Sequence, residues 1–267
     1  MSDFLKQMAA TSAERAAVAP VLGSADFDRP VVPLELRGFD VIAEIKQRSP
    51  AEGELKLSER GRVEQAALYA EGGAAAISVL TEPSRFDGSL EHLSEVVDAL
   101  PGTPVMRKDF LVEPVQIDEA RAAGASGVLL IVAMLDDAKL REMLDCAYGH
   151  GLFVLLESFD GADIARAGAL LGDEDRERMA AGTLLFGVNT RNLRTLEVDP
   201  ERLRLLVDQL PEAARVAESG LHTADDAARV AGYGYTMALV GTALMRSDDP
   251  ATLIADMKRA GALGLAA

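Results

Sequence analysis

Charged and amide side chains recur directly after short apolar runs of this chain. Lysines and carboxylates can donate and accept protons, and a guanidinium offers a planar fork to a carboxylate or a phosphate. The pattern therefore predicts acid–base chemistry on an anionic substrate. The residues that follow the apolar runs include Glu44 and Lys46, Lys108 and Asp109, Glu157, Asn189 and Arg191, Glu218 and Ser219, and Gly241 and Thr242.

Eight apolar runs precede or include those residues, and each is rich in leucine or in β-branched residues. Their near-continuous apolar character suits parallel strands that are covered on the outside, not half-exposed antiparallel strands. The predicted strands are residues 41–45, 75–80, 104–107, 127–132, 153–156, 184–188, 215–217 and 236–240.

An amphipathic stretch follows each run. Several of these stretches begin with a Ser, Thr or Asp that can cap a helix, and several end near a glycine, as at Gly72, Gly124, Gly151 and Gly232. We expect helices at residues 62–70, 89–100, 114–123, 136–149, 160–171, 200–210, 223–231 and 251–260.

Eight strand–helix units in 267 residues predict an α/β fold, a single closed (β/α)8 TIM barrel. An open doubly wound sheet usually carries a glycine-rich loop after its first strand, and residues 46–50 do not resemble one. Residues 1–38 stand outside the eightfold count, and their amphipathic part is residues 3–18. We expect one domain over residues 1–267, with residues 1–38 as an N-terminal helical extension.

Composition limits the classes of partner. The net charge of −16 argues against binding to nucleic acid, and no apolar run approaches the length of a membrane span. The N-terminus lacks a secretory signal pattern, and Cys146 is the single cysteine, so we expect a cytoplasmic protein in which this thiol packs in a helix. A phosphorylated substrate would need local cations, and Lys46, Arg48, Lys108 and Arg191 supply them.

The polar residues should meet at one end of the barrel, because chemistry in this fold sits at the carboxyl ends of the strands. Any one of them alone could be a helix cap or a solvated loop charge. Glu44 and Lys46 alternate along the first strand, so we expect both to face the mouth as a mutually tuned pair.

Five sequence blocks resemble the signatures of indole-3-glycerol-phosphate synthases, in that family's order and at the expected strand ends. The similarity runs from about residue 39 to about residue 245. The blocks are Ala43-Glu44-Ile45-Lys46-Gln47-Arg48-Ser49-Pro50, Ile77-Ser78-Val79-Leu80-Thr81-Glu82, Arg107-Lys108-Asp109-Phe110, Val188-Asn189-Thr190-Arg191-Asn192-Leu193 and Glu218-Ser219-Gly220.

The resemblance implies a carboxy-lyase of tryptophan biosynthesis. Its substrate would be 1-(2-carboxyphenylamino)-1-deoxyribulose 5-phosphate, and its products indole-3-glycerol phosphate, CO₂ and water. Such a reaction needs two acids, a base, an anion clamp and a phosphate cradle. The resemblance implies neither a metal nor an organic cofactor.

Catalytic roles follow from the same resemblance. Lys108 would be the general acid for ring closure, and we expect burial and neighbouring cations to lower its pKa. Glu157 would be the base or electrostatic partner on the opposite wall. Glu44 and Lys46 would position the substrate and take part in dehydration, and which lysine acts in which step stays open. Asn189 and Ser219 complete the catalytic set.

Substrate contacts are assigned in the same way. Arg191, with Asn189 and Ser49, would orient the anthranilate carboxylate and the ribulose hydroxyls. The phosphate is expected near Ser219, Gly220, Gly241 and Thr242, where a short helix N-terminus adds a favourable dipole. The remaining predicted contacts are Glu218 and an apolar wall of Phe110, Leu129 and Leu239.

Some features leave alternatives open. Residues 49–53 read Ser-Pro-Ala-Glu-Gly, residues 158–160 read Ser-Phe-Asp, and Thr242 stands where the family often has Glu or Ser. A paralogue acting on a modified anthranilate, and a catalytically weakened barrel kept for sugar-phosphate or partner binding, are therefore alternatives. A phosphoribosylanthranilate isomerase is a third, although it would need a catalytic cysteine.

The three histidines, His92, His150 and His222, match no catalytic block. Their spacing along the sequence fits neither a metal site nor a catalytic triad, so we assign them no chemistry and expect no metal. We expect a monomer or a weak homo-oligomer.

Overall fold

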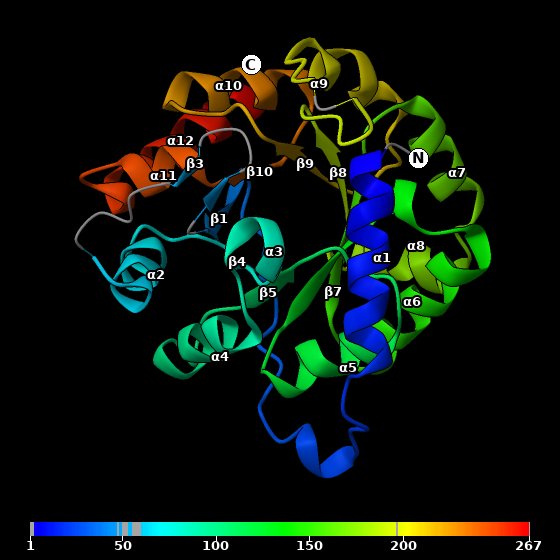
Figure 1. Ribbon diagram of the computed structural model, residues 1–267. Helices are drawn as coiled ribbons and strands as arrows, with labels where there is room; N and C mark the ends of the chain where they lie inside the picture. Colours follow the sequence, from blue (N-terminus) through cyan, green and yellow to red (C-terminus); the bar gives the residue numbers. More distant parts are fainter. Residues whose placement is uncertain (1–2, 47, 50–52, 55–59, 196, 267) are drawn as a thin grey trace.

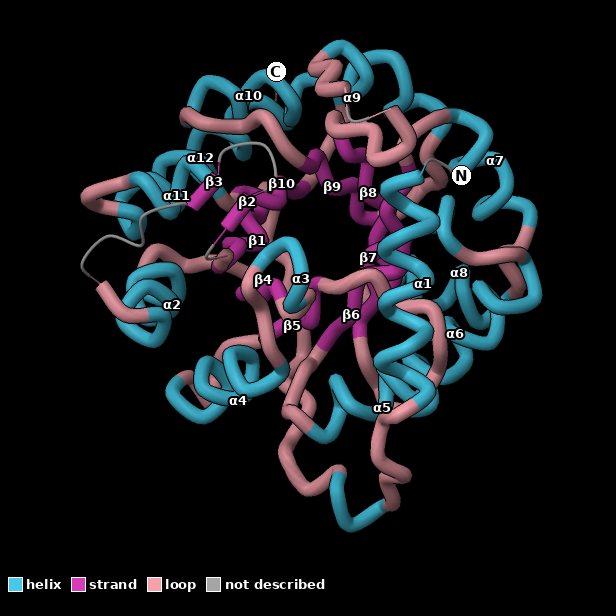
Figure 2. The backbone as a smooth tube through the Cα atoms, viewed as in Figure 1, coloured by secondary structure: helices cyan, strands magenta, loops and turns pink. Residues whose placement is uncertain are grey.

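Parallel strands close into a barrel surrounded by helices (Figures 1 and 2). The computed structural model describes residues 3–46, 48–49, 53–54, 60–195 and 197–266, and for residues 48–49 and 53–54 it describes the backbone alone. The predicted TIM-barrel fold is confirmed for this part of the chain.

Every predicted strand is present, with its ends shifted by at most two residues. Around the barrel the strands pair in chain order, and the last pairs with the first. The barrel strands are β1 (Asp40–Ile45), β4 (Ala76–Leu80), β5 (Val105–Lys108), β6 (Gly127–Ile131), β7 (Phe153–Ser158), β8 (Leu184–Asn189), β9 (Ala214–Glu218) and β10 (Met237–Val240). A separate antiparallel pair, β2 (Arg48–Ser49) and β3 (Gly53–Glu54), follows β1.

The predicted helices are also present, and side chains cap five of them. Ser89, Asp136, Asp160, Thr223 and Asp249 each accept a hydrogen bond from a backbone N–H of the first turn. The helices are α1 (Asp3–Ala17), α2 (Arg62–Glu71), α3 (Pro83–Phe86), α4 (Leu90–Ala99), α5 (Val115–Ala122), α6 (Asp137–Gly149), α7 (Gly161–Ala169), α8 (Asp173–Ala180), α9 (Glu201–Leu206), α10 (Ala224–Tyr233), α11 (Thr242–Arg246) and α12 (Pro250–Leu265).

The helix prediction is wrong or incomplete in some details. Gly232 does not end its helix but lies inside α10, and the residue that ends it is Gly234, whose φ of 106° suits glycine. The helix α8 was not predicted, because its sequence is polar on almost every face and so has no apolar stripe.

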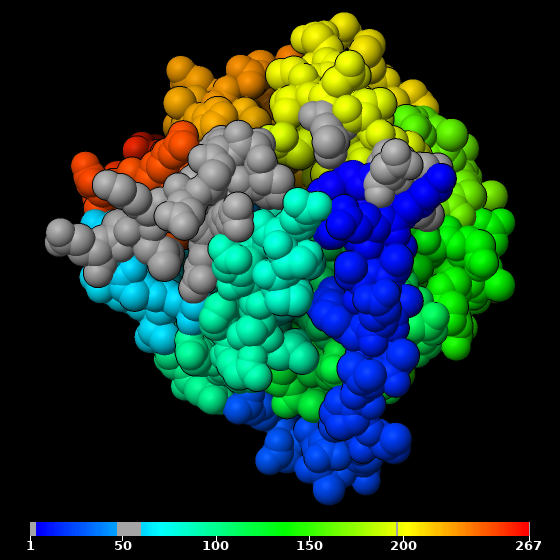
Figure 3. Space-filling view, in the orientation of Figure 1, coloured from blue at the N-terminus to red at the C-terminus, as the bar shows by residue number. Residues whose placement is uncertain are grey.

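The predicted N-terminal stretch forms α1, which lies along the rim of the barrel mouth beside α3 (Figures 1 and 3). Leu5 and Met8 of α1 are buried, and Arg85 of α3 donates a hydrogen bond of 3.0 Å to Gln7 of α1. The extension therefore forms part of the wall around the mouth. No helix in the described ranges is long and apolar enough to cross a membrane.

Candidate active site

A pocket of about 830 Å³ opens at the carboxyl ends of the barrel strands. It contains acids, cations, amides and apolar side chains from most of the strands, as the sequence predicted. The predicted site residues that line it are Glu44, Lys46, Lys108, Phe110, Leu129, Glu157, Asn189, Arg191, Ser219, Gly220, Leu239, Gly241 and Thr242.

One wall of the pocket holds a buried cluster in which Glu44 pairs with two lysines. The Nζ of Lys46 lies 2.7 Å from one oxygen of Glu44, and the Nζ of Lys108 lies 2.9 Å from the other. Burial opposes ionisation of Glu44, but the two ammonium groups outweigh it and lower its pKa to about 2. The carboxylate is therefore ionised at neutral pH and holds both cations in place.

The expectation that Lys108 has a lowered pKa is wrong. Burial does act in that direction, but the negative charges of Glu44, Glu157 and Glu218 outweigh it and raise the pKa of Lys108. The neighbours that decide the pKa are carboxylates instead of cations, so Lys108 is an ammonium group at neutral pH. It therefore carries a proton that it can donate.

Gly241 makes room for this cluster at the end of β10. A Cβ at this position would lie 2.3 Å from Glu44 Oε1 and 2.9 Å from Lys46 Nζ. Any larger residue would displace the ion pair. The glycine expected to contact phosphate thus has a second role that depends on its lack of a side chain.

The opposite wall is organised by Asn189, the last residue of β8. Its Nδ2 donates a hydrogen bond of 3.1 Å to Glu157, and its Oδ1 accepts one of 2.8 Å from the Ser219 hydroxyl and one of 2.9 Å from the Arg191 backbone N–H. These contacts fix the orientation of the amide and join three strand ends, β7, β8 and β9.

Glu218 lies beneath this wall and does not line the pocket. It is 1% exposed, and both of its carboxylate oxygens are buried without a hydrogen-bond donor among the described residues. Burial and the neighbouring Glu157 carboxyl raise its pKa well above the usual value. Gly187 leaves space for it, since a Cβ there would lie 2.0 Å from Glu218 Oε1. Glu218 is therefore protonated more readily than an exposed glutamate.

The apolar wall is more aromatic than the sequence indicated. Phe110 lines the pocket as predicted, and the ring of Phe4 packs edge-on against it with ring centres 6.0 Å apart, while Phe86 lies 6.2 Å away. Phe4 and Phe86, from α1 and α3, were missed. The amphipathic pattern of residues 3–18 includes Phe4 and was the one sequence feature that could have indicated its burial.

Neighbouring side chains at the end of β5 point in opposite directions. Lys108 points into the pocket, whereas Arg107 is buried on the outer side and contacts Asp109 at 3.2 Å. Asp109 also receives two hydrogen bonds from Arg15 of α1, of 2.7 and 2.8 Å. The partner of Lys108 is therefore Glu44, and Asp109 instead anchors the N-terminal helix.

Ser49 and two of the histidines remain to be placed. Ser49 lies in β2, and its side chain is outside the described residues. His222 lines the pocket, although no chemistry was assigned to it. His150 does not line the pocket and contacts Asp118 close to Cys146, a grouping that the sequence analysis did not predict. Spacing along one segment could not reveal it, because Asp118 comes from a different helix.

Comparison with known proteins agrees with the geometry of the pocket. The family model described as indole-3-glycerol phosphate synthase matches residues 31–257. Indole-3-glycerol phosphate synthase from a Nocardioides species is 46% identical over 85% of this chain and 84% of that protein. The protein of the same name from an Arthrobacter species is 41% identical over 98% of this chain and 90% of that protein.

Solved structures show the fold alone. 3-Hexulose-6-phosphate synthase from Salmonella typhimurium matches with a TM-score of 0.61 at 16% identity, over 83% of this chain and 98% of that chain. Thiamine phosphate pyrophosphorylase from Pyrococcus furiosus matches with a TM-score of 0.59 at 18% identity, over 85% of this chain and 97% of that chain. Taken with the sequence matches, these findings lead to one conclusion: the chain belongs to the indole-3-glycerol phosphate synthase family.

Proposed function

We propose that this protein converts 1-(2-carboxyphenylamino)-1-deoxyribulose 5-phosphate into indole-3-glycerol phosphate, CO₂ and water. The observation that carries the proposal is the buried Glu44 carboxylate with an ammonium group on each of its oxygens, across the pocket from the Glu157 carboxyl. Such a site can give a proton to a developing oxyanion and accept another later.

Lys108 acts in ring closure in this proposal. The ring carbon that bears the carboxylate attacks the C2′ carbonyl, a carbon–carbon bond forms, and the carbonyl oxygen takes a proton from the Lys108 ammonium. Loss of CO₂ then returns its bonding electron pair to the ring and restores aromaticity. Glu44 keeps Lys108 charged and oriented, because it lies 2.9 Å from the Nζ atom.

Dehydration needs a second acid and a base. The new hydroxyl leaves as water after it takes a proton, and the neighbouring carbon loses a proton to give the indole. We assign these transfers to Lys46 and to Glu157. Glu218 acts through Glu157, because it is buried beneath the wall and its own pKa is raised.

The remaining lining residues would bind the substrate. Arg191 and Asn189 suit the anthranilate carboxylate and the ribulose hydroxyls, and the aromatic wall around Phe110 suits the ring. Ser219 and Gly220 have positive φ values of 68° and 73°, which turn the backbone at the end of β9 where the phosphate is expected. We propose that the protein acts in the cytoplasm as one domain, as a monomer or a weak homo-oligomer.

An isomerase function has less support. A phosphoribosylanthranilate isomerase would need a thiol in the mouth, whereas Cys146 lies in α6 and does not line the pocket.

A direct assay tests the proposed function. The protein is incubated with the carboxyphenylamino substrate, and indole fluorescence and CO₂ release are followed together. We expect equal amounts of the two products. Turnover of only a ring-substituted anthranilate derivative would favour the paralogue, and binding without turnover would favour a weakened barrel.

A further inference from the structure

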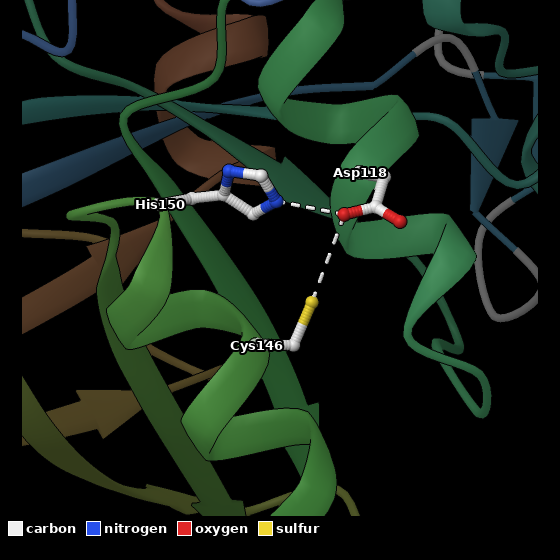
Figure 4. A group of neighbouring side chains, drawn as sticks. All are labelled: Asp118, Cys146 and His150. Atoms are coloured by element: carbon white, nitrogen blue, oxygen red, sulfur yellow. Dashed lines mark hydrogen bonds and ion pairs between the residues drawn. The ribbon is translucent and has the colours of Figure 1, made fainter. Parts of the chain in front are cut away.

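A second cluster of side chains lies away from the pocket, between α5 and α6 (Figure 4). Asp118 comes from α5, Cys146 from α6, and His150 from the residue that caps the end of α6. The Nε2 atom of His150 lies 2.7 Å from Asp118 Oδ1, and the Cys146 Sγ lies 3.8 Å from the same oxygen. The three donor atoms all lie within 4.8 Å of one another.

The helices determine this arrangement. Cys146 and His150 are four residues apart, so they lie one turn apart on the same face of α6. The ring of Phe27 packs edge-on against the His150 ring with centres 4.8 Å apart, and Arg121 donates a hydrogen bond of 2.9 Å to the Phe27 carbonyl. The N-terminal segment therefore supports the imidazole with its Nε2 atom directed at Asp118.

A sulfur, an imidazole nitrogen and a carboxylate oxygen together suit Zn²⁺. In tetrahedral zinc sites the metal–ligand distances of about 2.0–2.3 Å place ligand atoms roughly 3.3–3.8 Å apart. The contacts of 2.7 and 3.8 Å bracket that spacing, so small side-chain rotations would admit the ion. Mg²⁺ and Ca²⁺ prefer all-oxygen sites, and this donor set disfavours them.

The cluster is accessible and separate from the pocket. The side chains of His150 and Asp118 are 19% and 34% exposed, which leaves a path for an ion and for a water as fourth ligand. None of the three residues lines the pocket at the barrel mouth. Zn²⁺ would displace the thiol proton of Cys146 on binding, because a cysteine binds this metal as the thiolate.

We propose that Asp118, Cys146 and His150 bind one Zn²⁺ on the outer face of the barrel and that the ion joins α5 to α6. The fourth position is filled by water. The site goes beyond the proposed function, and its role is structural: an ion that binds the folded chain alone raises stability by mass action.

The test uses untagged protein of residues 1–267 that has been freed of metal with a chelator. Zn²⁺ is titrated against a chromophoric chelator in excess Mg²⁺ and Ca²⁺, which occupy nonspecific carboxylates on this acidic chain. We expect one equivalent to bind, and Cys146→Ser and His150→Gln to weaken that binding by roughly 100-fold or more. His92→Gln and Asp145→Asn, a histidine and an acid outside the cluster, serve as matched controls and should bind like the unmodified chain.

Co²⁺ reports the sulfur ligand directly. A thiolate–cobalt charge-transfer band should appear with the unmodified chain and be absent with Cys146→Ser. Indole formation should be unchanged in these variants, so a failure of the proposed catalytic function would leave the zinc result intact. The inference is overturned if no equivalent binds, or if Cys146→Ser and His150→Gln bind Zn²⁺ as tightly as the controls.

Discussion

Glu44 sets the charge state of the pocket at the scale of single residues. Its two oxygens hold Lys46 and Lys108, and Gly241 leaves the space in which they meet. Across the pocket, Asn189 fixes Glu157, and Gly187 admits Glu218 behind it. One wall thus carries the ammonium groups, and the other carries the Glu157 carboxyl with Glu218 behind it.

Glu157→Gln should lower single-turnover rates by roughly 100-fold, because it removes the carboxylate while keeping a similar shape. The loss in Glu157→Gln combined with Lys108→Met should be smaller than the product of the two single losses, since both groups serve one reaction coordinate. Single-turnover kinetics of the two variants and their combination measure this, with exposed Glu64→Gln as the control. Losses that multiply would show that the two groups act in independent steps.

Residue types and order were enough to predict many of the residues that line the pocket, but not the aromatic residues of α1 and α3 and not the charge state of Lys108. The pKa of Lys108 depends on three carboxylates that come from β1, β7 and β9, and no stretch of sequence places them together. The same holds for His150, whose partner Asp118 lies on another helix. Contacts between elements decide both cases.

Helix α1 is the element that ties the N-terminal segment to the site. Arg15 reaches Asp109, which follows Lys108 in sequence, and Phe4 adds to the aromatic wall. The guanidinium groups of Arg15 and Arg107 outweigh the burial of Asp109 and lower its pKa. The helix is therefore joined to the strand end that carries Lys108.

Arg15→Met should destabilise the protein by roughly 2–3 kcal/mol, because a buried carboxylate loses one of its two cationic partners. It should also lower turnover, since the end of β5 is no longer held by α1. Chemical denaturation and steady-state kinetics measure both effects. The matched control is Arg204→Met, which breaks an exposed ion pair on α9. Equal effects from the two substitutions would contradict a positioning role for Arg15.

Strands and helices with a strong apolar pattern could be predicted from sequence to within a few residues, because that pattern reflects which face is buried. The elements without such a pattern could not. Helix α8 is polar on nearly all sides, and α3 is a single turn capped by the Glu82 side chain. Phe4 reaches the pocket only because α1 packs against the barrel mouth, and the local sequence of α1 does not encode that packing.

At the scale of the whole molecule, a chain with a net charge of −16 gathers Lys46, Lys108 and Arg191 in one pocket. The closed barrel makes this possible, since it brings residues from strands far apart in sequence to one mouth. The count of eight strand–helix units predicted this topology, because few other folds accommodate it in one chain of this length.

The free energy of unfolding should depend on pH through the ion pairs of Glu44 with Lys46 and Lys108. The pKa of Glu44 is lowered from 4.5 to about 2, so the carboxylate stabilises the folded state above pH 4.5, and this contribution is lost as the pH falls toward 2. Glu44→Gln should therefore be less stable at neutral pH by up to about 3 kcal/mol, and the difference should narrow below pH 4.5. Urea unfolding from pH 7 to pH 2 measures it, with Glu64→Gln as control. Parallel curves for the unmodified chain and Glu44→Gln would contradict the assignment.

The central claim is that the Lys108 ammonium closes the ring, and Lys108→Met tests it most directly. Single-turnover kinetics are compared with the binding of a substrate analogue. The analogue is reduced at the C2′ carbonyl, so it cannot cyclise. The exposed substitution Lys6→Met is the control. We predict that analogue binding weakens only modestly, that the fold is kept, and that turnover falls by roughly 10²–10⁴-fold. Turnover of Lys108→Met within a few-fold of the Lys6→Met control would contradict the claim and assign ring closure to Lys46.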